Sequence, residues 1–184
     1  WNGDNIAQKS TRRRPRATPS HHLSLATTAT NKDEQYTLRL NIPTPEDMED
    51  VGGLLSVTSN QGDVILLDGD LGAGKTCFSR GFIRARTGRV DERVTSPTYL
   101  LSNTYSTNDT EEEEEAINIY HMDLYRLSDD NDDALTPLDL ENVYTNGISL
   151  IEWPSRLKRK PVNRLDVTLT IDSTISAATA ELSD

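Results

Sequence analysis

Residues 63–76 constrain the fold more than any other part of the sequence. An apolar run over residues 63–68 predicts a buried strand, and residues 75–86 predict a helix. Between them, residues 69–76 match the pattern G-x-x-x-x-G-K-[ST] of a phosphate-binding loop. The order strand, loop, helix is required because the loop amides and the positive end of the helix face the same phosphates. The segment therefore predicts a parallel α/β unit that binds a nucleoside triphosphate.

Each position of this loop has an expected role. Glycines let backbone N–H groups point inward around phosphates, Lys75 brings a positive charge to the β/γ oxygens, and the Thr76 hydroxyl is a magnesium ligand. The candidate cofactor-binding residues are Gly69, Asp70, Leu71, Gly72, Ala73, Gly74, Lys75 and Thr76. The base-reading motif Asn-Lys-x-Asp of GTPases should follow the loop, but residues 31–34 precede it and end in Glu34. ATP and Mg²⁺ are therefore the expected cofactors.

Composition limits the remaining possibilities. The 184 residues fit one domain with tails. The net charge is −11 although the first thirty residues are basic, so an RNA contact would need a partner or a small patch such as residues 156–160. The single cysteine, Cys77, cannot form an internal disulfide. No apolar run is long enough to span a bilayer.

Both ends of the chain and one internal loop differ in amino-acid composition from the rest of the chain. Residues 1–34 are rich in Arg, Ser and Thr, which predicts a disordered basic extension and is equally typical of an organellar transit peptide. Residues 107–115 form an acidic loop in which the glutamate run 111–115 repels itself. Residues 35–172 are thus the expected ATPase domain, followed by a tail over 173–184.

The remaining pattern predicts the layout of this domain. Alternating apolar residues predict a strand over residues 36–42, and Thr44 and Pro45 begin a helix with an apolar stripe of Met48, Val51, Leu54 and Leu55. Further strands are expected near residues 99–101, 117–123 and 148–152, a short helix over 135–144, and a last antiparallel edge strand over 165–171. We expect an α/β P-loop NTPase fold of three layers, with a mostly parallel central sheet and antiparallel edge strands.

Two acids end apolar strands after the loop, Asp123 and Glu152. Ligands in open α/β sheets lie at the carboxyl ends of strands, and a magnesium-bound triphosphate needs acids there to hold the metal and orient water. Lys75, Asp123 and Glu152 are therefore the candidate catalytic residues, and Thr76, Glu152 and Asp123 the candidate metal ligands. The alternative for either acid is a surface or helix-capping carboxylate.

Three features near these acids each have more than one possible role. His121 lies two residues before Asp123 on the same strand face, where it either aligns the acid or lines the site, or is a hydrogen-bonded structural residue. Thr95, Ser96 and Thr98 form either a loop that orders over the γ-phosphate or a plain Ser-Pro turn. Trp153 either packs against the nucleotide site or anchors the turn before Pro154.

Five blocks in order make the sequence resemble the TsaE (YjeE) family. They are residues 69–76, 78–82 (Phe-Ser-Arg-Gly-Phe), 96–99 (Ser-Pro-Thr-Tyr), 121–127 (His-Met-Asp-Leu-Tyr-Arg-Leu) and 151–154 (Ile-Glu-Trp-Pro). The resemblance implies a P-loop ATPase that is weak alone and works with a TsaD-like ligase and a TsaB-like partner. That complex transfers a threonylcarbamoyl group to the adenosine following the anticodon of tRNA, so this chain would meet tRNA only through the complex.

Carried over by position, the resemblance makes Thr76 and Glu152 magnesium ligands, places Asp123 near the metal and water, and makes residues 96–99 a switch-like loop. Three features depart from the family pattern: Met48 where a threonine is common, Cys77 in place of a second threonine, and the glutamate run. Hydrolysis is expected to be slow because no arginine finger is evident, although Arg126 is a candidate.

Two other functions stay open on sequence grounds. One is a nucleotide-dependent switch that docks a partner without obligatory turnover; the other, less favoured, is a small-molecule kinase. The resemblance implies a cytoplasmic location, whereas a transit peptide would direct the protein to a mitochondrion or plastid.

Overall fold

The computed structural model describes residues 37–107, 116–127 and 135–171. The chain divides into two units, Trp1–Asn41 and Ile42–Asp184, and all helices and strands below belong to the second. The predictions for the basic extension, the glutamate run and the C-terminal tail fall outside the described residues. Within those residues, no helix is both long and apolar enough to cross a membrane.

The strand predicted over residues 36–42 is wrong for the described residues 37–42. They have no regular secondary structure, and the side chains of Leu38 and Leu40 are exposed. Alternation of apolar residues stabilises a strand only where a neighbouring strand pairs with its backbone and a second layer covers one face. The described residues 37–42 have no such pairing.

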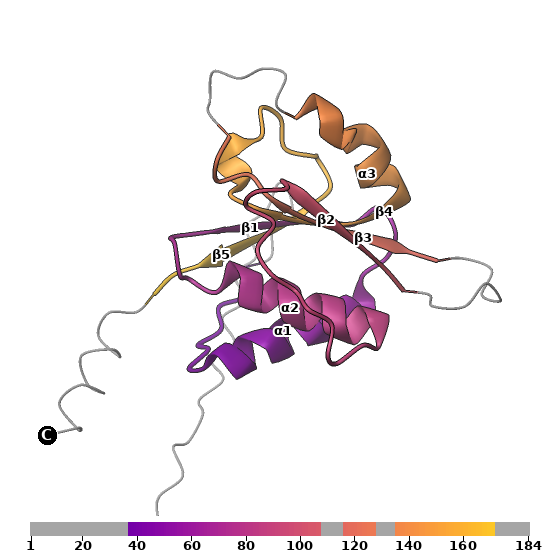
Figure 1. Ribbon diagram of the computed structural model, residues 1–184. Helices are drawn as coiled ribbons and strands as arrows, with labels where there is room; N and C mark the ends of the chain where they lie inside the picture. Colours follow the sequence, from indigo (N-terminus) through magenta and orange to yellow (C-terminus); the bar gives the residue numbers. More distant parts are fainter. Residues whose placement is uncertain (1–36, 108–115, 128–134, 172–184) are drawn as a thin grey trace, which may run out of the picture. The chain divides into compact units, whose positions relative to one another are not determined.

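The second unit has the expected three layers (Figure 1). Its helices are α1 (Pro45–Thr58), α2 (Lys75–Thr87) and α3 (Leu140–Asn146), with short 3₁₀ helices at Thr136–Leu138 and Pro154–Arg156. Its strands are β1 (Val64–Gly69), β2 (Ser102–Ser106), β3 (Asn118–Asp123), β4 (Gly147–Glu152) and β5 (Leu165–Leu169). They form one sheet in the order β2-β3-β4-β1-β5. The prediction of a mostly parallel α/β sheet of P-loop type is confirmed.

The two sheet edges differ in direction. β2 pairs antiparallel with β3, as expected of an edge strand, but β5 pairs parallel with β1, so the antiparallel assignment of the last strand is wrong. A parallel neighbour needs a connection of about a dozen residues to carry the chain back across the sheet. Residues 153–164 provide that connection between β4 and β5, which the alternating pattern within β5 could not reveal.

The helix start at Thr44 is confirmed. The Thr44 Oγ1 accepts a hydrogen bond from the Asp47 backbone N–H at 3.1 Å, and Pro45 occupies the first helical turn. Met48, Val51 and Leu55 pack against the core, but Leu54 is 72% exposed, contrary to the expected stripe. Gly52 makes the close approach to α2, and Leu54 lies about 200° further round the helix, so its side chain faces outward.

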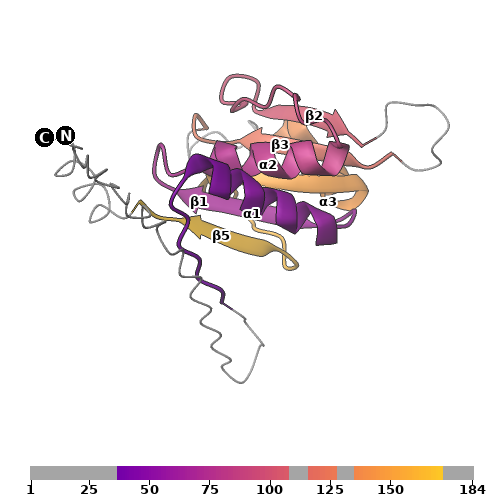
Figure 2. The same cartoon turned by 90° about the horizontal axis from the view of Figure 1, so that it is seen from below.

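α1 and α2 cross the same face of the sheet (Figure 2). Glu49 of α1 accepts hydrogen bonds from Arg80 at 2.9 Å and from Arg84 at 3.2 Å on α2. The hydrogen bond that Arg80 donates to Glu49 raises the pKa of this arginine. α2 ends at Gly88, whose φ of 70° is the left-handed conformation that glycine adopts without strain.

Alternation along the strands divides the core between the two faces. Ile65, Leu67, Ile119 and Leu150 pack with α2, whereas Val64, Leu66, Met122 and Ile151 pack on the α3 side. Every residue of β4 is buried because helices cover both faces of a central parallel strand. The same alternation assigns His121, Asp123 and Glu152 to the face that α2 covers, next to the start of that helix.

The α1–α2 contact predicts a difference between two adjacent glycines. A Cβ on Gly52 would lie 2.1 Å from the Phe78 carbonyl oxygen, a backbone atom that cannot move without displacing α2. We expect Gly52→Ala to lower the free energy of unfolding by about 3 kcal/mol through overpacking, measured by denaturant titration.

Gly53→Ala is the matched control. There the nearest atom to the added Cβ is the Ala85 side chain at 3.4 Å, so the gain in helix propensity of up to about 1 kcal/mol should dominate. Equal stability of the two variants would contradict the close backbone contact between α1 and α2.

Candidate functional site

The loop between β1 and α2 depends on glycines in conformations that other residues rarely adopt. Gly69 and Gly74 have φ values of 145° and 102°. A Cβ on Gly69 would also lie 2.4 Å from the Leu169 carbonyl oxygen of β5, so this position admits no side chain. The backbone then turns tightly, with the Ala73 N–H donating to the Asp70 carbonyl at 3.1 Å. The loop thus leads directly from the carboxyl end of β1 into the N-terminus of α2.

Lys75 is buried despite its charge. Its Nζ donates to the Gly69 carbonyl at 2.7 Å and to the Asp70 carbonyl at 2.8 Å. The same ammonium lies 4.1 Å from the centroid of the Trp153 ring. Tyr125 packs against this tryptophan, with ring centroids 4.8 Å apart. The Lys75 head group is therefore held at the loop by carbonyl dipoles and by an aromatic face. Of the two roles considered for Trp153, this contact favours packing against the predicted nucleotide site.

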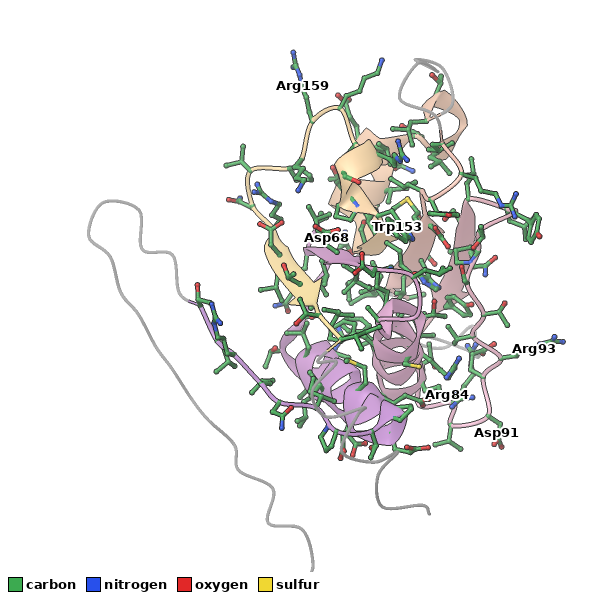
Figure 3. All side chains as sticks on the ribbon, turned by 90° about the vertical axis from the view of Figure 1, so that its left-hand side faces the viewer. Asp68, Arg84, Asp91, Arg93, Trp153 and Arg159 are labelled. Atoms are coloured by element: carbon green, nitrogen blue, oxygen red, sulfur yellow. The ribbon has the colours of Figure 1, made fainter. Side chains whose placement is uncertain are left out.

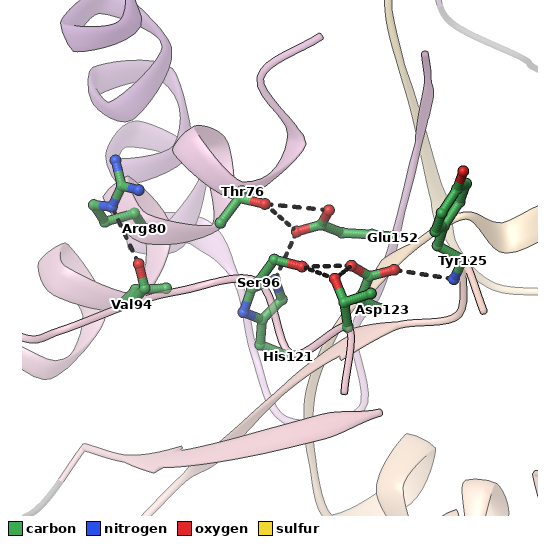
Figure 4. Close-up of polar contacts among 9 residues, drawn as sticks. Thr76, Arg80, Val94, Ser96, His121, Asp123, Tyr125 and Glu152 are labelled. Carbon is green, nitrogen blue, oxygen red and sulfur yellow. Dashed lines mark hydrogen bonds and ion pairs between the residues drawn. The ribbon is translucent and has the colours of Figure 1, made fainter. Parts of the chain in front are cut away.

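Thr76, Glu152 and His121 form a polar group at the start of α2, in which Thr76 is half-buried (Figure 4). The Thr76 Oγ1 lies 3.0 Å from Glu152 Oε1 and 3.3 Å from Oε2. The His121 Nε2 lies 2.8 Å from the same Oε1. His121 is fully buried and Glu152 is 2% exposed. Of the two roles left open for His121, the structure supports contact with an acid, but the acid is Glu152 and not the neighbouring Asp123.

Asp123 has a different set of partners (Figure 4). Its Oδ2 accepts hydrogen bonds from the hydroxyls of Ser96 and Thr98, the latter at 2.6 Å, and its Oδ1 accepts one from the Tyr125 backbone N–H at 3.0 Å. Asp123 is thus no surface carboxylate. It fastens the loop before β2 to the carboxyl end of β3.

The loop at residues 95–101 contains the turn considered from its sequence, and ordering of this loop over a γ-phosphate stays a prediction. The backbone N–H groups of Leu100 and Leu101 donate to the Pro97 carbonyl at 2.9 and 2.8 Å, which is a turn. The Ser96 and Thr98 hydroxyls meanwhile bind Asp123. Because residues 97–101 form this turn, β2 begins at Ser102 and not near residue 99.

The register of the sheet brings the two acids together. Asp123 and Glu152 are paired at the last position of β3 and β4, and both side chains face α2. Carboxylate and hydroxyl oxygens are hard ligands that suit Mg²⁺. Among the described residues no group of three His, Cys, Asp or Glu side chains could hold a metal alone. The residues present fit Mg²⁺ in the form in which it is held by one or two carboxylates, phosphate oxygens and water.

Other predicted residues lie around this site without joining it. Met48 lies against the loop, 3.4 Å from where a Gly74 Cβ would be, and Cys77 is a half-buried free thiol. Arg126 stacks over the Tyr99 ring, 4.4 Å from its centroid. In the basic segment 156–160, Arg159 points away from the ribbon (Figure 3). The metal and catalytic roles assigned to Lys75, Thr76, Asp123 and Glu152 stay predictions.

Comparisons with known proteins agree on one family. The model of the family "Threonylcarbamoyl adenosine biosynthesis protein TsaE" matches residues 42–179. The TsaE protein of Bacillus subtilis is 33% identical over 68% of this chain and 72% of its own length, and that of a Nostoc species is 38% identical over 68% and 73%. The crystal structure of Bacillus subtilis YdiB shares the fold, with a TM-score of 0.52 and 24% identity over 89% of this chain and 97% of its own.

The Asp123 contacts predict how the loop at residues 95–101 responds to mutation. Thr98→Val keeps the shape of the side chain but removes a hydroxyl bound to a buried carboxylate. We expect a loss of about 1–2 kcal/mol in stability and faster hydrogen exchange of the Leu100 and Leu101 amides. Thr104→Val, on an exposed position of β2, should change neither quantity. Unaltered exchange in Thr98→Val would mean that Asp123 does not hold the loop.

Proposed function

The chain belongs to the TsaE family of threonylcarbamoyladenosine biosynthesis proteins, and from this premise we propose that it binds ATP with Mg²⁺ and hydrolyses it slowly. It would act with a TsaD-like ligase and a TsaB-like partner in modifying the adenosine that follows the anticodon of tRNA. In this scheme the ligase makes the modification, and the ATPase resets the ligase between turnovers. Contact with tRNA would be indirect, through the complex.

One observation carries the ATPase proposal. The Thr76 hydroxyl, at the end of a complete phosphate-binding loop, lies 3.0 Å from the buried carboxylate of Glu152 on a neighbouring strand. A loop hydroxyl and a strand-end acid in contact are the two protein groups that P-loop NTPases use to hold Mg²⁺. Burying a carboxylate is costly without partners, and a cation with phosphate ligands would compensate that cost.

The residues of the site would have separate roles in ATP binding and hydrolysis. Bound Mg²⁺–ATP would supply the phosphoanhydride bond to be broken and the cation that neutralises its oxygens. The Lys75 ammonium would exchange the Gly69 and Asp70 carbonyls for phosphate oxygens. Glu152 and Thr76 would together hold the Mg²⁺ ion. Asp123 would accept a hydrogen bond from the attacking water or from water on the metal.

The arginines near the site explain why hydrolysis would be slow. Arg80 is bound to Glu49 and to the Val94 carbonyl, and Arg126 is stacked on Tyr99. Stabilising the transferring phosphoryl group by an arginine is worth several orders of magnitude in rate. We therefore propose that a partner protein supplies this charge or moves Arg126 toward the site.

The first prediction for this function concerns Glu152. Glu152→Ala should lower the rate of ATP hydrolysis at least about 100-fold, because it removes the acid that holds metal and water, while ATP affinity falls much less. Hydrolysis would be measured as phosphate release and affinity by calorimetry. Glu141→Ala, an exposed acid on α3 across the sheet, should match the wild type in both. Near-normal turnover in Glu152→Ala would refute the assigned role.

The second prediction concerns partners. Hydrolysis by the full chain should be slow alone and should rise at least about tenfold when a TsaD and TsaB pair is added, if a partner completes the charge around the phosphates. The rate would be measured at fixed ATP and Mg²⁺ with each partner singly and with both. Measurable ATP binding without any rise would count against the TsaD–TsaB proposal.

The alternative function, a switch without obligatory turnover, has one observation in its favour. Tyr99 and Leu100 are 83% and 74% exposed on the loop that Asp123 fastens beside the nucleotide site, which suits a nucleotide-sensitive docking surface. The two functions differ in one outcome. If Glu152→Ala binds ATP and still supports repeated rounds of tRNA modification, the switch is correct; if modification stops after one round, turnover is required.

A further inference from the structure

We propose that His121 is a positioning residue for Glu152. A proton on its Nε2 would hold the carboxylate at Oε1 and so leave Oε2 as the oxygen available to a metal ion at the phosphate-binding loop. This inference rests on the proposed function, because Glu152 is there the acid that serves Mg²⁺–ATP. It adds a residue that would touch neither nucleotide nor metal.

The position of His121 leaves its ring few alternatives. It is paired with Leu150 of β4 and Asn103 of β2, inside the sheet, and is fully buried. Glu152 lies two residues beyond Leu150 on the same face of β4, so the histidine and the acid are diagonal neighbours on parallel strands. A ring fixed at this depth can reach the carboxylate but not the solvent.

The hydrogen-bond partners assign the proton on the ring. Nε2 lies 2.8 Å from Glu152 Oε1, and an ionised carboxylate only accepts hydrogen bonds, so Nε2 carries the hydrogen. Nδ1 is buried and has no hydrogen-bond partner among the described residues. The geometry therefore points to a hydrogen on Nε2 that is donated to Glu152.

This hydrogen bond limits which oxygen of Glu152 can accept a further partner. Oε1 accepts from His121 at 2.8 Å and lies 3.0 Å from the Thr76 hydroxyl, whereas Oε2 has the longer contact of 3.3 Å with Thr76. Rotation of the carboxylate would break the bond to His121. Oε2 thus remains the oxygen with the greater capacity to accept a further hydrogen bond or a metal. Partners of this kind orient ligating carboxylates in metal sites, and losing them costs 10–100-fold in metal affinity or activity.

Two amide variants separate this role from simple burial of a polar side chain. The amide nitrogen of Gln reaches about as far as Nε2 of His, whereas that of Asn stops near the position of Nδ1. We expect His121→Asn to lower ATP hydrolysis about tenfold or more and to raise the Mg²⁺ concentration needed for half-maximal ATP binding. His121→Gln should recover most of that loss. Equal loss in both variants, with thermal unfolding unchanged, would overturn the proposal.

A double mutant tests whether His121 acts through Glu152. If it does, His121→Asn should have no further effect on the Mg²⁺ dependence of ATP binding once Glu152 is replaced by Ala. A residue that serves only the fold would add its effect in full. Additive effects would therefore contradict a positioning role.

The hydrogen on the His121 ring can be located without nucleotide and without an activity assay. His21 and His22 are the other two histidines of the chain, so a full-length His21→Gln, His22→Gln protein has one imidazole. Nitrogen NMR should show that Nε2 of this ring carries hydrogen. An Nε2 without hydrogen would overturn the inference, even if the Asn variant fails to fold.

These measurements also distinguish the inference from the proposed function. If the wild-type chain does not bind Mg²⁺–ATP, the proposed function fails, and the inference about a magnesium-serving acid fails with it. If the wild type binds and hydrolyses ATP but His121→Asn behaves like the wild type, only the inference is wrong.

Discussion

The parallel register between β3 and β4 is the constraint on which the site depends. It pairs Asp123 with Glu152 at the last position of two adjacent strands, and strand alternation turns both carboxylates toward α2. A shift of one residue in either strand would move its acid to the α3 face, into a mainly apolar cluster and away from Thr76, Ser96, Thr98 and His121. The buried residues of β4 prevent such a shift because every position on both faces is packed.

The two acids, though adjacent, are held in different ways. Glu152 is linked to the rigid elements of the fold, through Thr76 at the start of α2 and His121 inside β3. Asp123 is linked to the loop at residues 95–101, through Ser96 and Thr98. A ligand that changes the hydrogen bonds of Asp123 would therefore change the loop that exposes Tyr99 and Leu100. Under the proposed function, this change in the loop would signal to a partner protein whether nucleotide is bound.

Much of the site was predictable because it follows from patterns within short segments of the sequence. The phosphate-binding loop, its strand and its helix follow from eight residues and their flanks, and the acids were found because each ends an apolar run. The strand at residues 36–42 was wrong because alternation says nothing about whether a neighbouring strand is present. The direction of β5 was wrong because a strand pattern is the same in either direction. The exposed Leu54 was missed because the close approach at Gly52 sets which side of α1 faces α2.

The sequence by itself determined the elements and the chemical groups: a phosphate-binding loop, two strand-end carboxylates, a histidine and two loop hydroxyls. Spacing along one chain fixes these because helix and strand periods are local properties. Only the tertiary structure decided which groups meet. His121 contacts Glu152 and not Asp123, Lys75 lies on Trp153, and the Ser96 and Thr98 hydroxyls bind Asp123. These contacts join residues far apart in the chain, and strand order and register, which no local pattern encodes, determine them.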